Sequence, residues 1–206
     1  MVPVVWLSAR LALLAACASA ARMALGGSSA LERREFAMTT ATDVGFVELR
    51  IAKVVGLGAA EDEMVQCVVL DEVAGDRHLP IEIGQAEAFS LAARLGGIEW
   101  RRPMTYQLTA ALVQALGGRV RQVRIDRLVE EVYAATIEVE GPLGMQSVDA
   151  RPSDVLNLAV LVDAPIFAAA EVLVEAEARR AGDSAEAALL RQALVAPPMT
   201  VGTVGM

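Results

Sequence analysis

The chain has 206 residues, 55% of them hydrophobic, and a formal net charge of -8 with a pI near 4.8. This length fits one domain with tails, or at most a domain and a half, and the apolar content excludes a chain that is disordered throughout. An acidic chain repels nucleic acid on average, which argues against a passive nucleic-acid coat, although an enzyme can carry a local basic site on an acidic body.

The first segment, Met1–Met23, is apolar and alanine-rich and leaves three interpretations open. It is a secretory signal, with Leu14–Cys17 as a lipoprotein-like cleavage box, or a functional helix, or an extension created by a start codon placed too far upstream. No basic residue precedes Arg10, so the charged lead of a signal is missing. Met38 opens a short polar lead into a strand, as a cytoplasmic start would. We treat residues 1–42 as an N-terminal extension.

Localisation follows from the same segment. We expect a cytoplasmic protein without stable membrane association, because the apolar run after Arg10 is too short to span a bilayer. A genuine signal in residues 1–23 would instead make the protein exported or lipid-anchored.

Period-two alternation of apolar residues predicts the strands. They are expected around residues 47–51, 65–69, 79–83, 119–128, 133–139 and 145–149. The acidic turn Asp71–Asp76 joins the second and third strands as a hairpin, and the Gly141–Pro142 turn precedes the last strand.

Apolar residues at three-four spacing predict the helices, each with one stripe that faces the core. They are expected around residues 88–95, 108–115, 155–162, 171–180 and 183–194. The stripe of the second helix consists of Leu108, Ala111, Leu112 and Ala115. The third helix is apolar nearly all round and should be the most buried.

Strands that cluster early and helices that are interleaved later predict an α+β fold. We expect a single domain at residues 43–180, with a mixed, largely antiparallel sheet and three to five helices packed on it. Residues 181–206 are expected to form a C-terminal helix and a flexible tail.

The cysteine and histidine content limits the possible metal chemistry. Cys17 and Cys67 are too few for a disulfide framework or a thiolate metal site, and Cys67 is typical of a small buried hydrophobe. His78 is the single histidine, which excludes a histidine-rich zinc site and any mechanism that needs two histidines. A catalytic metal would be held by carboxylates, which favour magnesium or manganese.

One compact polar block, Asp149–Asp154, lies within apolar sequence, while phosphate-loop, dinucleotide-binding and serine-hydrolase motifs are absent. Pro152 suits the first turn of a helix, and Asp154 stands in that turn. The block has structural explanations, because Asp154 would stabilise the helix start and Asp149 could simply pair with Arg151. A plain strand-to-helix joint needs only one cap, however, so the whole block indicates a functional site.

Arginines make one region of net positive charge in the acidic chain, which either grips a phosphate backbone or forms a solvated surface or subunit interface. They are Arg94, Arg101, Arg102, Arg119, Arg121, Arg124 and Arg127.

Three sequence blocks, in order, resemble one known family. They are LPIEIGQAEAFSLA at Leu79–Ala92, RRPMTYQL at Arg101–Leu108, and DARPSDVLNLAVLVDAPIFAAAEVL from Asp149 onward. Residues from about Phe46 to Ala170 resemble the bifunctional nuclease family, also known as a DNase/RNase domain. The resemblance implies cleavage of DNA and RNA without sequence specificity.

The resemblance also assigns polar family positions to residues of this chain. They are Glu87, Thr105, Asp149, Arg151, Ser153 and Asp154. The family's usual histidine after Thr105 is Tyr106 here. A phenol with a pKa near 10 is a poor base at neutral pH but can donate a hydrogen bond.

Two functions are consistent with these features. In the first, the protein is a nuclease in which Asp149, Asp154 and Glu87 hold a divalent ion, magnesium or manganese, that activates water. Arg151 would stabilise the charge on phosphorus, and the substrate-binding residues would be Ser153, Thr105, Tyr106, Arg101, Arg102 and Arg119.

In the second, the protein is a non-enzymatic homo-oligomeric module, regulatory or scaffolding, with the same fold. A catalytic site should leave its carboxylates unpaired around a cleft, whereas an interface module should pair each with an arginine. For both functions, the high hydrophobic content predicts that the protein forms a homo-oligomer, and we expect a dimer.

Overall fold

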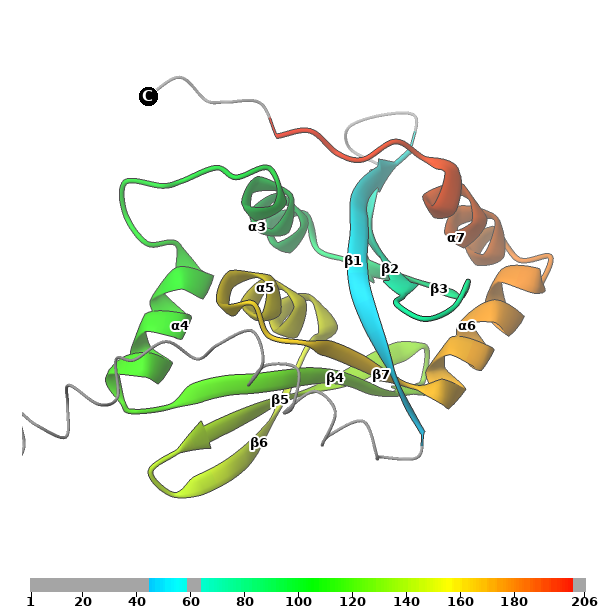
Figure 1. Ribbon diagram of the computed structural model, residues 1–206. Helices are drawn as coiled ribbons and strands as arrows, with labels where there is room; N and C mark the ends of the chain where they lie inside the picture. Colours follow the sequence, from blue (N-terminus) through cyan, green and yellow to red (C-terminus); the bar gives the residue numbers. More distant parts are fainter. Residues whose placement is uncertain (1–44, 59–63, 202–206) are drawn as a thin grey trace, which may run out of the picture. The chain divides into compact units, whose positions relative to one another are not determined.

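A computed structural model describes residues 45–58 and 64–201 (Figure 1). The interpretations of residues 1–42, Cys17 included, fall outside the described residues, as does the last part of the expected tail, residues 202–206. The described chain forms one sheet with helices packed on it, so the predicted α+β class is confirmed.

Among the described residues, the helices and all strands but one fall where the periodicity placed them; the exception is the short strand at Ile166–Ala169, which the alternation did not predict. The strands are β1 (Phe46–Leu57), β2 (Val65–Glu72), β3 (His78–Ile83), β4 (Arg119–Val129), β5 (Val132–Gly141), β6 (Gly144–Ala150) and β7 (Ile166–Ala169). The helices are α3 (Gln85–Leu95), α4 (Thr105–Ala115), α5 (Pro152–Val162), α6 (Ala170–Ala181) and α7 (Ala185–Val195). Over residues 45–58 and 64–201, no helix is both long and apolar enough to cross a membrane.

The strands lie in the order β3-β2-β1-β7-β4-β5-β6. The short strand β7 joins two antiparallel halves, because it pairs antiparallel with β1 and parallel with β4. The sheet is therefore mixed and largely antiparallel, as predicted. Its two edge strands, β3 and β6, lead directly into α3 and α5.

Helices cover both faces of the β1–β2 part of the sheet. Val68 and Leu70 of β2 belong to the main core, which also includes buried residues of α3 and α5. Cys67 and Val69 alternate with them, and they pack with Ala193 of α7 in a second core. Because successive side chains of a strand point to opposite faces, α7 lies on the face opposite α3 (Figure 1).

The most buried helix is α5, as its all-round apolar sequence predicts. It packs against α3, α4, β4 and β5, so apolar side chains on several of its faces find partners. The polar exceptions are Ser153 and Asn157, which are 6% and 4% exposed. Both lie in the first half of the helix, where the candidate site is found.

The orientation predicted for α4 is wrong. The expected core stripe is exposed, with Leu108 and Leu112 52% and 53% accessible, and the helix has no buried residue. The side that packs on the core instead carries Tyr106, Ala110 and Val113. Both sides of α4 are apolar, so periodicity alone selected the stronger stripe and not the one that meets α5.

Candidate active site

Two strand-to-helix joints build the site. Gly84 links β3 to α3, and Arg151 links β6 to α5. Both joint residues have extended backbones, with φ and ψ of -66° and 155° at Gly84 and -72° and 148° at Arg151. Each helix begins at the next residue, Gln85 in α3 and Pro152 in α5. The fixed φ of Pro152 suits the first position of a helix. Glu87 and Asp154 consequently stand in the first turns of their helices.

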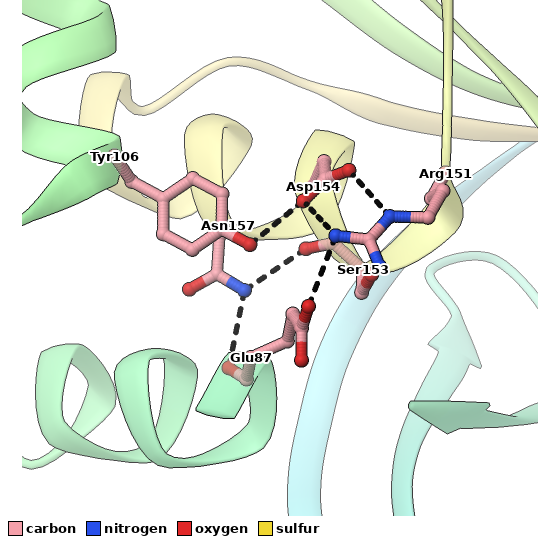
Figure 2. A network of polar contacts seen from close by, with 6 residues as sticks. All are labelled: Glu87, Tyr106, Arg151, Ser153, Asp154 and Asn157. Carbon is pink, nitrogen blue, oxygen red and sulfur yellow. Dashed lines mark hydrogen bonds and ion pairs between the residues drawn. The ribbon is translucent and has the colours of Figure 1, made fainter. Parts of the chain in front are cut away.

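The Arg151 guanidinium connects the two joints (Figure 2). Its Nε donates to Asp154 Oδ2 at 2.9 Å and its Nη2 to Asp154 Oδ1 at 3.1 Å. The same Nη2 donates to Glu87 Oε1 at 2.9 Å, across 64 residues of sequence. Side-chain exposure is 67% for Arg151, 19% for Glu87 and 29% for Asp154. A solvent-facing guanidinium is thus held on two less exposed carboxylates.

A third helix start joins this cluster through Tyr106. The residue lies in the first turn of α4, and its hydroxyl donates to Asp154 Oδ1 at 2.8 Å (Figure 2). Burial, followed by the hydrogen bond to Asp154, raises the pKa of Tyr106 well above its ordinary value. The phenol therefore stays protonated at neutral pH and acts as a donor.

The charge state of Asp154 follows from opposing effects. Partial burial acts to raise the pKa of this carboxyl, but the hydrogen bonds from Arg151 and Tyr106 outweigh it, so the pKa lies below its usual value. Asp154 is therefore ionised at neutral pH and is a weak base. Its hydrogen bond also raises the pKa of Arg151, which stays charged.

Asn157 is a site residue that sequence reasoning missed. Its Nδ2 donates to the backbone oxygen of Glu87 at 3.2 Å and to that of Ser153 at 2.9 Å (Figure 2). It thereby attaches the first turn of α3 to the first turn of α5. The available signal was a single amide side chain within the apolar run of α5, four residues after Ser153.

Asp149 is not brought into the cluster. Its β5 neighbour is Thr136, while the flanking β6 residues pair with the buried Ala135 and Ile137. Asp149 therefore lies on the sheet face opposite α5. The suggested Asp149–Arg151 pair is not formed, because Arg151 binds Glu87 and Asp154 instead.

The expected substrate-binding residues are distributed more widely than one site. The Ser153 side chain is buried in α5, whereas Thr105 is exposed at the first position of α4. Arg101 and Arg102 are exposed in the segment before α4, and Arg119 is exposed at the start of β4. Two other members of the arginine region form ion pairs: Arg121 with Glu140 and Arg124 with Glu138.

The arrangement does not supply the three carboxylates expected for a metal. Glu87 and Asp154 are both bound to Arg151, and Asp149 faces elsewhere. Within residues 45–58 and 64–201, no group of three or more histidine, cysteine, aspartate or glutamate side chains is placed to hold a metal ion.

The electrostatics of the cluster combine two signs. One guanidinium and two carboxylates give +1 - 2 = -1 as the formal charge. Opposing this, the first turns of α3, α4 and α5 bring three positive helix-dipole ends to the same cluster. An anion that displaces one carboxylate from Arg151 would be attracted both by the guanidinium and by the positive helix ends.

Fold and site together define an α+β domain whose polar cluster lies where two sheet edges pass into helices. The sequence model of the bifunctional nuclease domain matches residues 68–181. The chain belongs to the bifunctional nuclease domain family, which confirms the resemblance carried by its three sequence blocks.

Two of three similar proteins carry the name bifunctional nuclease, and the third is uncharacterised. An uncharacterised protein of Mycobacterium tuberculosis is 37% identical over 124 residues, 60% of this chain and 74% of the relative. Bifunctional nuclease 1 of Arabidopsis thaliana is 34% identical over 91 residues, and bifunctional nuclease 2 of Oryza sativa subsp. japonica is 31% identical over 91 residues. Each plant match covers 43% of this chain and 28% of the plant protein. The family points to a nuclease-related function.

Proposed function

We propose that the protein is a nuclease, a hydrolase that cleaves phosphodiester bonds of DNA and RNA without sequence specificity at the cluster around Arg151. One observation carries the proposal: an exposed guanidinium is held at the junction of three helix starts in a chain of this family. Guanidinium forks and helix starts are both groups that bind phosphate oxygens. The plant relatives named as bifunctional nucleases support the same substrate class.

Arg151 would bind the scissile phosphate. Its Nη1, which makes no hydrogen bond among the described residues, would donate to the phosphate, and the guanidinium would stabilise the charge that develops on the phosphate oxygens as the bond to water forms. Asp154 would position Arg151, since it already accepts from both Nε and Nη2. Tyr106 would hold Asp154 in that orientation through its hydroxyl.

Glu87 would accept the proton of the attacking water. Only Oε1 of this carboxylate is bound to Arg151, and among the described residues no hydrogen bond reaches Oε2. The water oxygen forms a bond to phosphorus while the bond from phosphorus to the leaving sugar oxygen breaks. The water proton passes to Glu87, and the leaving oxygen takes a proton from solvent.

The test is cleavage of end-labelled single- and double-stranded DNA and RNA by the purified full chain, with and without chelator. We expect Arg151→Ala to lower the cleavage rate by ~10²-fold or more, as loss of a charge-stabilising donor does. The chelator arm decides whether a divalent ion, magnesium or manganese, assists the reaction.

Arg77→Ala is the matched control. Arg77 also binds a carboxylate through two nitrogens, with distances of 2.8 and 2.9 Å to Glu72, but it lies in the β2–β3 hairpin. This variant should cleave at the parental rate. Equal rates for parent and Arg151→Ala would show that the Arg151 cluster is not the active site. A parent that cleaves no substrate would contradict the proposed nuclease activity.

A specific observation also favours the second candidate, a non-enzymatic homo-oligomeric module of the same fold. Glu87 and Asp154 are both paired with Arg151, which is the arrangement expected of a structural or interface cluster. On this alternative, Arg151→Ala should leave two carboxylates without their cation and lower the melting temperature. The parent should then show no cleavage of any substrate, with or without metal.

A further inference from the structure

Glu87 is held at its backbone independently of its carboxylate. Asn157 Nδ2 donates to its backbone oxygen at 3.2 Å, which attaches the first turn of α3 to α5. The side chain then extends to Arg151, where Oε1 accepts at 2.9 Å. Anything that moves the carboxylate alone would leave the helix start in place.

The carboxylate of Glu87 folds back over Gly84. A Cβ added at Gly84 would lie 2.3 Å from Glu87 Oε2 and 3.2 Å from its Cδ. The 2.3 Å distance is far shorter than a van der Waals contact and the 3.2 Å distance is tight, whereas Oε1 would lie at an ordinary 3.7 Å, so the carboxylate must shift when Gly84 gains a side chain.

The backbone of Gly84 gives no other reason for glycine. Its φ of -66° and ψ of 155° are extended values that any residue adopts. Glycine is the usual choice where φ is positive, which is not the case here. The space above its Cα, taken by the Glu87 carboxylate, is what distinguishes this position.

We infer that Gly84 is a positioning residue: its missing side chain leaves the space that lets Glu87 reach Arg151. The inference rests on the proposed function insofar as Glu87 takes part in cleavage. The contact itself is a structural property and is measured separately. In Gly84→Ala the carboxylate end, which is flexible, must leave, while Asn157 keeps the first turn of α3 attached.

A second glycine of the chain offers a matched control. A Cβ at Gly75 would lie 2.4 Å from Glu72 Oε2, and Glu72 is also bound to an arginine, Arg77, although through both of its carboxylate oxygens. Gly75→Ala therefore makes the same steric change against the same kind of ion pair, in the β2–β3 hairpin. It should leave cleavage unchanged.

The experiment combines a crystal structure of Gly84→Ala with cleavage kinetics of the full chain. We expect the Glu87 Oε1 to Arg151 Nη2 contact to be lost. We also expect kcat to fall by ~10²-fold, the effect of losing a general base, to the level of Glu87→Ala. The double variant Gly84→Ala/Glu87→Ala should cleave no more slowly than Glu87→Ala alone, because the displaced group is already gone.

The two readouts separate the possible failures. A Gly84→Ala structure that keeps the 2.9 Å contact overturns the positioning role, whatever the kinetics show. A further loss of kcat in the double variant also overturns it, because Gly84 would then act through something other than Glu87. If the contact is lost but the parent and all variants are inactive, the positioning inference stands and the proposed nuclease fails.

Discussion

Tyr106 stands at the position where the resemblance to the family leads us to expect a histidine. Its hydroxyl is a fixed donor to Asp154, and burial keeps the phenol protonated. A general base must be unprotonated at the pH of the reaction, and this phenol is not. The proposed reaction therefore places proton transfer on Glu87 and leaves Tyr106 with an orienting role.

Replacing this phenol tests that assignment. In Tyr106→His, one imidazole nitrogen can donate to Asp154 while the other accepts a proton, with an unperturbed pKa of ~6.5. If the imidazole takes the proton of the attacking water in place of Glu87, cleavage should rise by ~10²-fold and increase with pH as the imidazole loses its proton; if it only orients Asp154, the rate should stay at the parental level. The measurement is the pH profile of kcat from pH 5 to 9.

Tyr106→Phe is the matched control, since it keeps the ring and removes only the hydrogen bond to Asp154. A His variant with the parental rate and a flat profile, and with an intact fold, would mean that the family histidine has a structural role.

Helix α7 is attached to the sheet by the chain's single lysine. Lys53 Nζ donates to the backbone oxygens of Leu194, in the last turn of the helix, and Ala196, just beyond it, at 2.8 and 2.6 Å. A cation at a helix C-terminus satisfies carbonyls that have no partner within the helix and opposes the negative end of the dipole. Sequence periodicity predicted the helix but gave no sign of this attachment.

Lys53→Met keeps the apolar stem and removes the charge. We expect the free energy of unfolding to fall by about 1–2 kcal/mol, the range for a charged group at a helix end. Urea unfolding followed by circular dichroism measures it.

Arg50→Met on the same strand is the comparison, because Arg50 is 70% exposed and its contact with Asp71 is a surface pair at 3.4 Å. Surface pairs contribute little, so this variant should unfold at the parental urea concentration. Identical midpoints for both variants would show that Lys53 does not stabilise α7.

Considered as a whole, the domain exposes one long apolar stripe, on α4. It consists of Met104, Leu108, Leu112 and Leu116, at 43%, 52%, 53% and 78% exposure. The helix carries no charged side chain, so two copies can approach each other along it without like-charge repulsion. We expect the predicted homo-oligomer to bury this stripe.

Light scattering at micromolar concentration checks the assembly. The parent should have the mass of a dimer, and the variant Leu108→Glu/Leu112→Glu should have the mass of a monomer, because a buried carboxylate without a partner disfavours association. Val174→Glu, at an apolar position of α6 that is 60% exposed, should remain dimeric. A monomeric parent would contradict the expected oligomer.

The local sequence pattern was sufficient to predict most of the helices and strands and the part of the site that lies before and within the first turn of α5. Period-two and three-four spacing located the helices and every described strand except β7, because burial on one face imposes those periods residue by residue. The polar block before α5 was visible in the same way, since charged residues in apolar sequence need a reason to be there. The sequence blocks also led to the correct family.

Tertiary structure alone decided which residues meet. Arg151 contacts Glu87 across 64 residues because the two edge strands of the sheet lead into helices that pack on each other, a pairing set by strand order and not by local sequence. The same holds for Asp149, close to Arg151 in the chain yet on the other face of the sheet. It also holds for α4, which has two apolar sides, because the position of α5 determines which of them is packed against the core. Periodicity indicates that a face of a helix or strand is apolar, but the elements that pack against it determine whether that face is buried.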